Sequence, residues 1–123
     1  MGQVAGVETA ALGCNWAFAP IVDIHYNWRN TVISTRSFGN TPEIVVERAK
    51  EYFDGISESP TACAMKHFPG DGIDERDQHV VTSYNTLPYE EWDRTYGHVY
   101  REMIGHGVQS IICLLYTSPS PRD

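Results

Sequence analysis

The sequence is short of cysteine, of basic residues and of long apolar runs. Its 123 residues include three cysteines, and nine lysines and arginines stand against sixteen aspartates and glutamates, giving a net charge of −7. Nucleic acids and anionic membrane surfaces attract clustered basic side chains, and here those side chains are scattered. No run approaches the roughly 18 apolar residues of a membrane-spanning helix. The composition therefore argues against nucleic acid and membrane as partners.

The cysteines form a sparse set, and they include no Cys-x-x-Cys pair. Such a set predicts neither a disulfide framework nor a zinc site, and we expect Cys14 and Cys63 to be buried thiols in a reducing compartment. The N-terminus, Met1 to Glu8, lacks the basic start and the apolar core of a signal peptide. We therefore expect a cytoplasmic protein, and no cofactor is expected.

The C-terminal residues 113–123 change character abruptly, from an apolar run that starts at Val108 to a Ser-Pro repeat. A Ser-Pro segment is typical of a disordered linker. This peptide also matches, at every position, one translation of the transposase adapter used to prepare sequencing libraries. We therefore expect residues 113–123 to be a non-native tail, and residues 1–112 to be a fragment of a larger domain.

Helical and strand patterns alternate along residues 1–112. We predict helices over residues 2–13, from 41 to 55 and from 87 to 105, and strands over residues 15–24, 62–65 and 108–112. Alternation with short apolar strands predicts a parallel sheet with crossover helices, in the α/β class. A doubly wound sheet and a (β/α)₈ barrel both satisfy this pattern. A barrel needs about 250 residues, so residues 1–112 would supply less than half of one.

Apolar residues recur at helical spacing in each predicted helix, which indicates the faces that pack on the sheet. The predicted faces comprise Val4, Val7, Ala11 and Leu12 in the first helix, Val45, Ala49, Tyr52 and Phe53 in the second, and Trp92, Tyr96, Val99, Met103 and Ile104 in the third.

Residues 66–79 concentrate the chemistry, because two His, three Asp, one Glu and one Lys follow a predicted strand there. A solvated acidic loop would also explain this composition. In extended backbone, however, side chains two positions apart face the same side. Asp77 could then accept a hydrogen bond from one ring nitrogen of His79, orient the ring and leave the other nitrogen free to transfer a proton.

A metal site is an alternative reading of the same loop. His67, Asp71, Asp77 and His79 are all possible ligands, but their spacing matches no compact zinc pattern and the calcium-loop pattern is also absent. We predict no metal here, and a metal-dependent hydrolase stays as a competing hypothesis.

Three motifs resemble those of family 3 glycoside hydrolases, in particular the β-N-acetylglucosaminidases of that family. Residues 66–70 with 77–79, Lys-His-Phe-Pro-Gly and Asp-Gln-His, resemble the signature Lys-His-Phe-Pro-Gly-His-Gly…Asp-Ser-His. Residues 18–24 resemble its Phe-Ala-Pro-Val-x-Asp strand, and residues 36–39, followed by Pro42, resemble its Arg-Ser-Phe-Gly-x-x-Pro. The order and spacing of the three motifs match along essentially all of residues 1–112.

The resemblance implies a role for each matched residue. His79 would be the acid/base of a mobile loop and Asp77 its partner, while Arg36, Lys66 and His67 would bind the sugar. Asp23, at the end of its predicted strand, is a further candidate for substrate binding. The implied fold is a partial (β/α)₈-like barrel, and the implied reaction is retaining hydrolysis of terminal β-linked N-acetylglucosamine from a carbohydrate substrate.

Two substitutions and one missing motif separate this chain from the common pattern. Asp71 stands where the signature has His, and Gln78 stands where it has Ser. The nucleophilic Asp of the family lies in a downstream Ser-Asp motif that this sequence lacks, so we expect the fragment to be inactive alone. A β-glucosidase of the same family and a non-catalytic carbohydrate-binding barrel are the competing interpretations.

Overall fold

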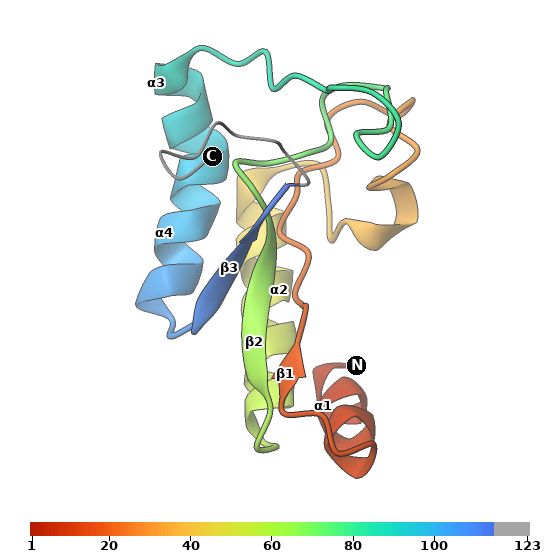
Figure 1. Cartoon of the computed structure of the whole chain (residues 1–123). Coiled ribbons are helices and arrows are strands. Elements are labelled where there is room, and N and C mark those ends of the chain that lie inside the picture. The colour runs from red at the N-terminus through yellow and green to blue at the C-terminus, as the bar shows by residue number, and fades with distance from the viewer. Residues whose placement is uncertain (115–123) are drawn as a thin grey trace, which may run out of the picture.

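The computed structural model describes residues 1–114, which form a parallel sheet with helices on one side (Figure 1). Its elements are α1 (Gly2–Ala11), β1 (Trp16–Ala17), the 3₁₀ turn η1 (Ser34–Arg36), α2 (Pro42–Ser57), β2 (Ala62–Phe68), α3 (Tyr89–Trp92), the π-helical turn η2 (Asp93–Gly97), α4 (His98–Gly105) and β3 (Ser110–Cys113). None of the helices within residues 1–114 is long and apolar enough to cross a bilayer.

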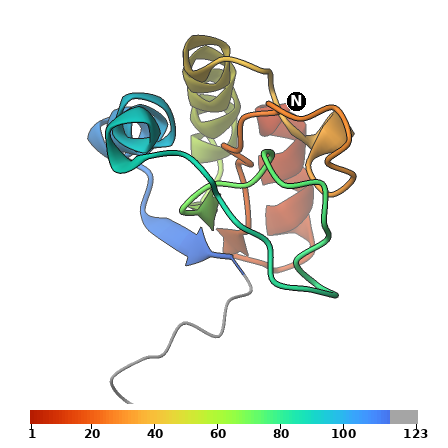
Figure 2. The ribbon, with the colours of Figure 1, turned by 90° about the horizontal axis from the view of Figure 1, so that it is seen from above.

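The three strands lie in the order β1-β2-β3, and both neighbouring pairs are parallel. The crossover from β1 to β2 contains α2, and the crossover from β2 to β3 contains α3, η2 and α4. Seen from above, the helices lie on one side of the strands and the other side carries no helix of the described chain (Figure 2). This is the arrangement of an arc of a (β/α)₈ barrel, whose loops at the carboxyl ends of the strands form the active site.

Helix α2 begins where the sequence predicts. The Thr41 hydroxyl accepts a hydrogen bond from the Ile44 N–H, and Pro42 takes the first helical position, where its missing N–H costs nothing. The helix continues past Gly55, which was the predicted end, to Ser57. Gly55 instead lies inside the helix at its contact with α1, where a Cβ would lie 2.6 Å from the Gln3 nitrogen.

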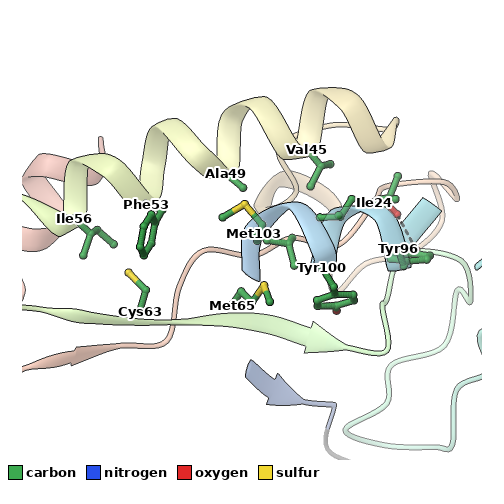
Figure 3. Packing of buried hydrophobic residues seen from close by; sticks show 12 residues of the cluster. Ile24, Val45, Ala49, Phe53, Ile56, Cys63, Met65, Tyr96, Tyr100 and Met103 are labelled. Atoms are coloured by element: carbon green, nitrogen blue, oxygen red, sulfur yellow. Dashed lines mark hydrogen bonds between the residues drawn. The ribbon is translucent and has the colours of Figure 1, made fainter. Parts of the chain in front are cut away.

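The core lies between the helices and the face of β2 that carries Cys63 and Met65 (Figure 3). Most of the predicted helix faces are confirmed, although Ile104 is exposed and Tyr100 takes the buried position. The buried cluster comprises Val22, Ile24, Val45, Ala49, Phe53, Ile56, Cys63, Met65, Tyr96, Val99, Tyr100 and Met103. It fixes β2 against α2 and α4, and so fixes the positions of the residues at the end of β2.

Helix α1 packs on α2 through small residues, which corrects the predicted apolar face. Gly2 and Gly6 are the buried residues of α1, whereas Val4, Val7 and Leu12 are exposed. A Cβ at Gly2 would lie 2.1 Å from the Tyr52 carbonyl oxygen, so only glycine permits this contact between the helices. Hydrophobic spacing could not reveal the contact, because glycine contributes no hydrophobic signal.

Several other boundaries and burials differ from the prediction. The first strand is reduced to Trp16–Ala17 plus an isolated bridge from Ile21 to Lys66, and α1 ends at Ala11. Strand β2 runs three residues beyond its predicted end at Met65, to Phe68, because it pairs with β3 through Lys66 and Phe68. Cys63 is buried as predicted, but Cys14 is exposed. Of the predicted non-native tail, Cys113 and Leu114 lie within the described chain and residues 115–123 lie outside it.

Candidate active site

The last residues of β2 border a cavity of about 280 Å³ at the carboxyl end of the sheet. Besides Lys66 and His67, the cavity is lined by Phe18, Gln78, His79, Ile112, Cys113 and Leu114. Cys113 and Leu114 belong to the predicted non-native tail, so our inferences about this cavity rest on the other lining residues. The structure thus brings three predicted site residues, Lys66, His67 and His79, to one cavity from two separate segments.

Arg36 lies in a neighbouring cavity of about 390 Å³, whose wall also includes Lys66 and Phe18. Its guanidinium donates to the Val32 carbonyl oxygen over 3.1 Å, which ties the side chain to its own loop. Partial burial lowers the pKa of Lys66, and the positive charge of Arg36 lowers it further, against an opposing effect of Asp23. Arg36 and Lys66 therefore form a donor-rich wall of the kind that binds hydroxyl or acyl oxygens.

Asp77 and His79 form the predicted pair, but a turn brings them together rather than an extended strand. His79 Nδ1 lies 2.6 Å from Asp77 Oδ1, and the same oxygen accepts the His79 N–H over 2.8 Å. The Val80 N–H donates to the Asp77 carbonyl oxygen, which closes a turn over residues 77–80. An Asx turn of this kind places the two side chains together without any strand.

This pair is exposed, with 53% of the His79 side chain and 44% of the Asp77 side chain open to solvent. Two hydrogen bonds from His79 lower the pKa of the Asp77 carboxyl. The bond from the His79 backbone has the larger effect and the bond from its ring the smaller. Within residues 1–114, His79 Nε2 has no hydrogen-bond partner. The ring is thus oriented through Nδ1, and His79 lines a cavity, as a proton-transfer group must.

Asp23 forms a second Asp–His pair at the end of β2. Its carboxylate is fully buried and lies 2.6 Å from His67 Nδ1, and it also accepts the N–H groups of His67 and Asp71. Both oxygens of the Asp23 carboxylate are thus engaged by hydrogen bonds to the surrounding structure. These contacts fit a residue that positions His67, and the substrate-binding role that the sequence suggested for Asp23 stays a prediction.

Sequence reasoning missed a buried polar network behind this site. The Asn30 amide, nearly fully buried, donates to Asp71 Oδ1 over 3.0 Å and to the Asp74 carbonyl oxygen over 2.6 Å. Asn30 lies in an irregular loop of ordinary polar composition, so no local signal distinguished it. His25 and Trp28 line a separate cavity of about 450 Å³ that does not include His79.

The four acidic and imidazole side chains considered for a metal site divide between two places. His67 contacts the Asp23 carboxylate through its ring and Asp71 contacts it through its backbone N–H, whereas His79 and Asp77 contact each other. Within residues 1–114, no three His, Cys, Asp or Glu side chains converge as metal ligands would.

Comparison with known proteins gives consistent results. The family model described as the glycosyl hydrolase family 3 N terminal domain matches residues 1–119. A beta-N-acetylglucosaminidase/beta-glucosidase from Cellulomonas fimi is 49% identical over 109 residues, which are 89% of this chain and 19% of that protein.

Two solved structures agree with the fold. The beta-glucoside phosphorylase BglX superposes with a TM-score of 0.88 at 40% identity, over 89% of this chain and 20% of its own. NagZ from Neisseria gonorrhoeae, in complex with N-trifluoroacetyl-D-glucosamine, superposes with a TM-score of 0.83 at 30% identity, over 92% of this chain and 32% of its own. This chain spans about a third or less of the length of each of these proteins. It belongs to glycosyl hydrolase family 3 and forms part of the TIM-barrel-like N-terminal domain of that family.

Proposed function

We propose that the protein containing this chain is a retaining glycosidase that removes terminal β-linked N-acetylglucosamine. The observation that carries the proposal is the Asp77–His79 pair, whose oriented ring borders the cavity that Lys66 and His67 also line. The Cellulomonas fimi relative and the amino-sugar complex of NagZ support an amino sugar as the substrate.

In the first step, protonated His79 donates the Nε2 proton to the departing glycosidic oxygen. At the same time, a carboxylate nucleophile from the remainder of the protein attacks the anomeric carbon and forms a glycosyl-enzyme. Neutral His79 then accepts a proton from water as the water oxygen displaces that carboxylate. Asp77 holds the ring through Nδ1 and stabilises its positive charge, while Arg36, Lys66 and His67 hold the sugar. On its own, the 123-residue chain should release no sugar, because it lacks the downstream Ser-Asp motif.

The test compares two leaving groups in the full-length protein. A nitrophenolate leaves without much help, whereas another sugar needs a proton. His79→Ala should therefore lower the single-turnover rate of glycosylation at least tenfold more for a disaccharide than for a nitrophenyl glycoside. Equal fractional losses for both substrates, on protein shown to be folded, would remove His79 from proton transfer.

A phosphorylase is the second candidate, and the likeness to BglX favours it. Phosphate could replace water in the second step, because an imidazole acid/base, unlike a carboxylate, does not repel that anion. Wild-type enzyme incubated with substrate and inorganic phosphate would then release the sugar 1-phosphate. Release of the free sugar alone would assign water as the acceptor. A parallel assay with nitrophenyl β-glucoside separates the β-glucosidase alternative.

A further inference from the structure

Two aromatic side chains of the crossover from β2 to β3 bind the loop that follows β2. The Trp92 indole N–H donates to the Pro69 carbonyl oxygen over 2.6 Å, and the Tyr96 hydroxyl donates to the Asp71 carbonyl oxygen. Trp92 ends α3, and Tyr96 lies in the π-helical turn η2. Single π turns are rare in proteins and frequently lie at functional sites. Hydrophobic spacing assigned both residues to an apolar helix face and gave no sign of these polar contacts.

Glycine lets this loop approach Tyr96 closely. Gly70 has a φ of +123°, and a Cβ there would lie 2.3 Å from the Tyr96 ring. Gly72 has a φ of +109°, and a Cβ there would lie 2.1 Å from the Ile24 carbonyl oxygen. The Tyr96 hydroxyl is also within hydrogen-bond distance of that oxygen, at 3.3 Å (Figure 3). Tyr96 therefore contacts two segments at once, the loop after β2 and the segment that contains Ile24.

The same two segments carry the buried Asp23–His67 pair. Asp71, whose carbonyl oxygen accepts from Tyr96, donates its own N–H to Asp23 Oδ1 over 2.8 Å. The Asp23 carboxylate in turn accepts from the His67 N–H and lies 2.6 Å from the ring nitrogen Nδ1 of His67. A path of hydrogen bonds thus runs from Tyr96 to His67, which lines the cavity of about 280 Å³.

We infer that Trp92 and Tyr96 are positioning residues, which fix the loop after β2 and, through it, hold the His67 ring at the cavity. Neither residue is among those that line this cavity. Tyr96 is fully buried, and burial raises the pKa of its hydroxyl, so the hydroxyl keeps its proton and can donate it at neutral pH. The effect on turnover rests on the function proposed above; the fixing of the loop does not.

Substitutions in the full-length protein that remove one donor and keep an aromatic ring test the inference. Tyr96→Phe removes the hydroxyl without opening a large cavity in the core. Tyr100→Phe is the matched control, because Tyr100 is also buried, in α4, and its hydroxyl has no hydrogen-bond partner within residues 1–114. Trp92→Phe removes the indole N–H, and it alone decides the inference if Tyr96→Phe does not fold.

Hydrogen–deuterium exchange of the Asp71 and Gly72 amides is the first readout, because these N–H groups donate to Asp23 Oδ1 and Asp71 Oδ1. Tyr96→Phe and Trp92→Phe should each accelerate this exchange by about tenfold or more and leave the exchange of α2 unchanged. Tyr100→Phe should leave the exchange of the loop at the wild-type rate. Wild-type exchange in a folded Tyr96→Phe or Trp92→Phe variant, or an equal acceleration in Tyr100→Phe, would overturn the inference.

Turnover is the second readout, and a double-mutant cycle separates positioning from general destabilisation. In folded protein, Tyr96→Phe should lower kcat/KM by about tenfold or more, to a similar extent for disaccharide and nitrophenyl substrates. Added to His67→Ala, it should lower kcat/KM by less than about threefold further, because its effect passes through His67. A larger further loss, or wild-type kcat/KM in Tyr96→Phe alone, would contradict the positioning role. If wild-type protein cleaves neither substrate, the proposed function fails, while the exchange measurements still decide whether these side chains fix the loop.

Discussion

Two Asp–His pairs with the same contact lie in this small structure, and they differ in almost everything else. In each, an Asp oxygen is 2.6 Å from a His Nδ1. The Asp23–His67 pair joins the segment that follows the Ile21 bridge to the end of β2, with 0% of the Asp side chain and 15% of the His side chain exposed. The Asp77–His79 pair lies within a four-residue turn and is about half exposed.

The difference shows that the contact alone does not define a role. Asp23 accepts hydrogen bonds from the His67 N–H, the His67 ring and the Asp71 N–H. Its pair therefore holds the end of β2 and the loop that follows it in place. Asp77 accepts hydrogen bonds from the His79 N–H and ring, so its pair can orient a ring and leave the ring accessible. Substitutions in the Asp23–His67 pair should therefore lower stability, whereas substitutions in the Asp77–His79 pair should lower turnover.

The largest expected effect is the loss of stability in Asp23→Ala. The substitution leaves the His67 and Asp71 N–H groups buried without an acceptor, which we expect to cost about 3 kcal/mol or more. Urea unfolding of the full-length protein measures this loss. Asp77→Ala is the matched control and should leave the unfolding midpoint unchanged, because its pair is exposed. Equal destabilisation by both substitutions would contradict the distinction.

The next effect separates binding from proton transfer. His67→Ala and Lys66→Ala should each lower kcat/KM at least tenfold, or about 1.4 kcal/mol, to a similar extent for disaccharide and nitrophenyl substrates. Arg36→Ala should behave in the same way. His79→Ala differs by sparing the nitrophenyl substrate. A leaving-group preference in Lys66→Ala, or wild-type kcat/KM in all three binding variants, would show that these roles are misassigned.

The sequence predicted the exposed pair far better than the buried one. Asp77 and His79 are close in sequence, so their contact needs only a local turn. The contact between Asp23 and His67 spans 44 positions, and it exists only because the Asp23 segment lies beside β2 in the sheet. Without the order of the strands, no spacing rule pairs them.

The fold shows the same division between local and non-local features. The parallel sheet with crossover helices follows from alternating patterns, and α2 begins where its capping residues are. The short β1 does not follow, because Asn15 to Ile24 reads as one apolar strand, whereas the structure has a strand at Trp16–Ala17 and then only an isolated bridge from Ile21 to Lys66. The hydrogen bonds of Asn30 to Asp71 and Asp74 were likewise hidden, since each residue alone is an ordinary loop residue.

A third prediction concerns Asp71, the acidic residue whose N–H donates to Asp23. Burial first, and the charge of Asp23 as well, raise the pKa of Asp71 above its ordinary value of 3.8, against the effect of its hydrogen bonds. The folded state then binds the proton more tightly than the unfolded state, so stability falls as pH rises from about 3.8 through the folded pKa. Asp71→Asn removes this penalty. Its stability relative to wild type should therefore be higher at pH 7 than at pH 3, and a constant difference would argue against the raised pKa.

The smallest effect is expected from Asp77→Ala, which removes the orienting partner and leaves the imidazole of His79. Disaccharide turnover should fall less than in His79→Ala, and nitrophenyl glycosylation should change little. Because His79 lowers the pKa of Asp77 below 3.8, the carboxylate stays charged above that pH and loses its charge as pH falls through the folded pKa. The two variants should therefore be compared above that pH, where Asp77 of the wild-type protein is charged. A deficit as large as that of His79→Ala would instead make Asp77 a direct participant in proton transfer.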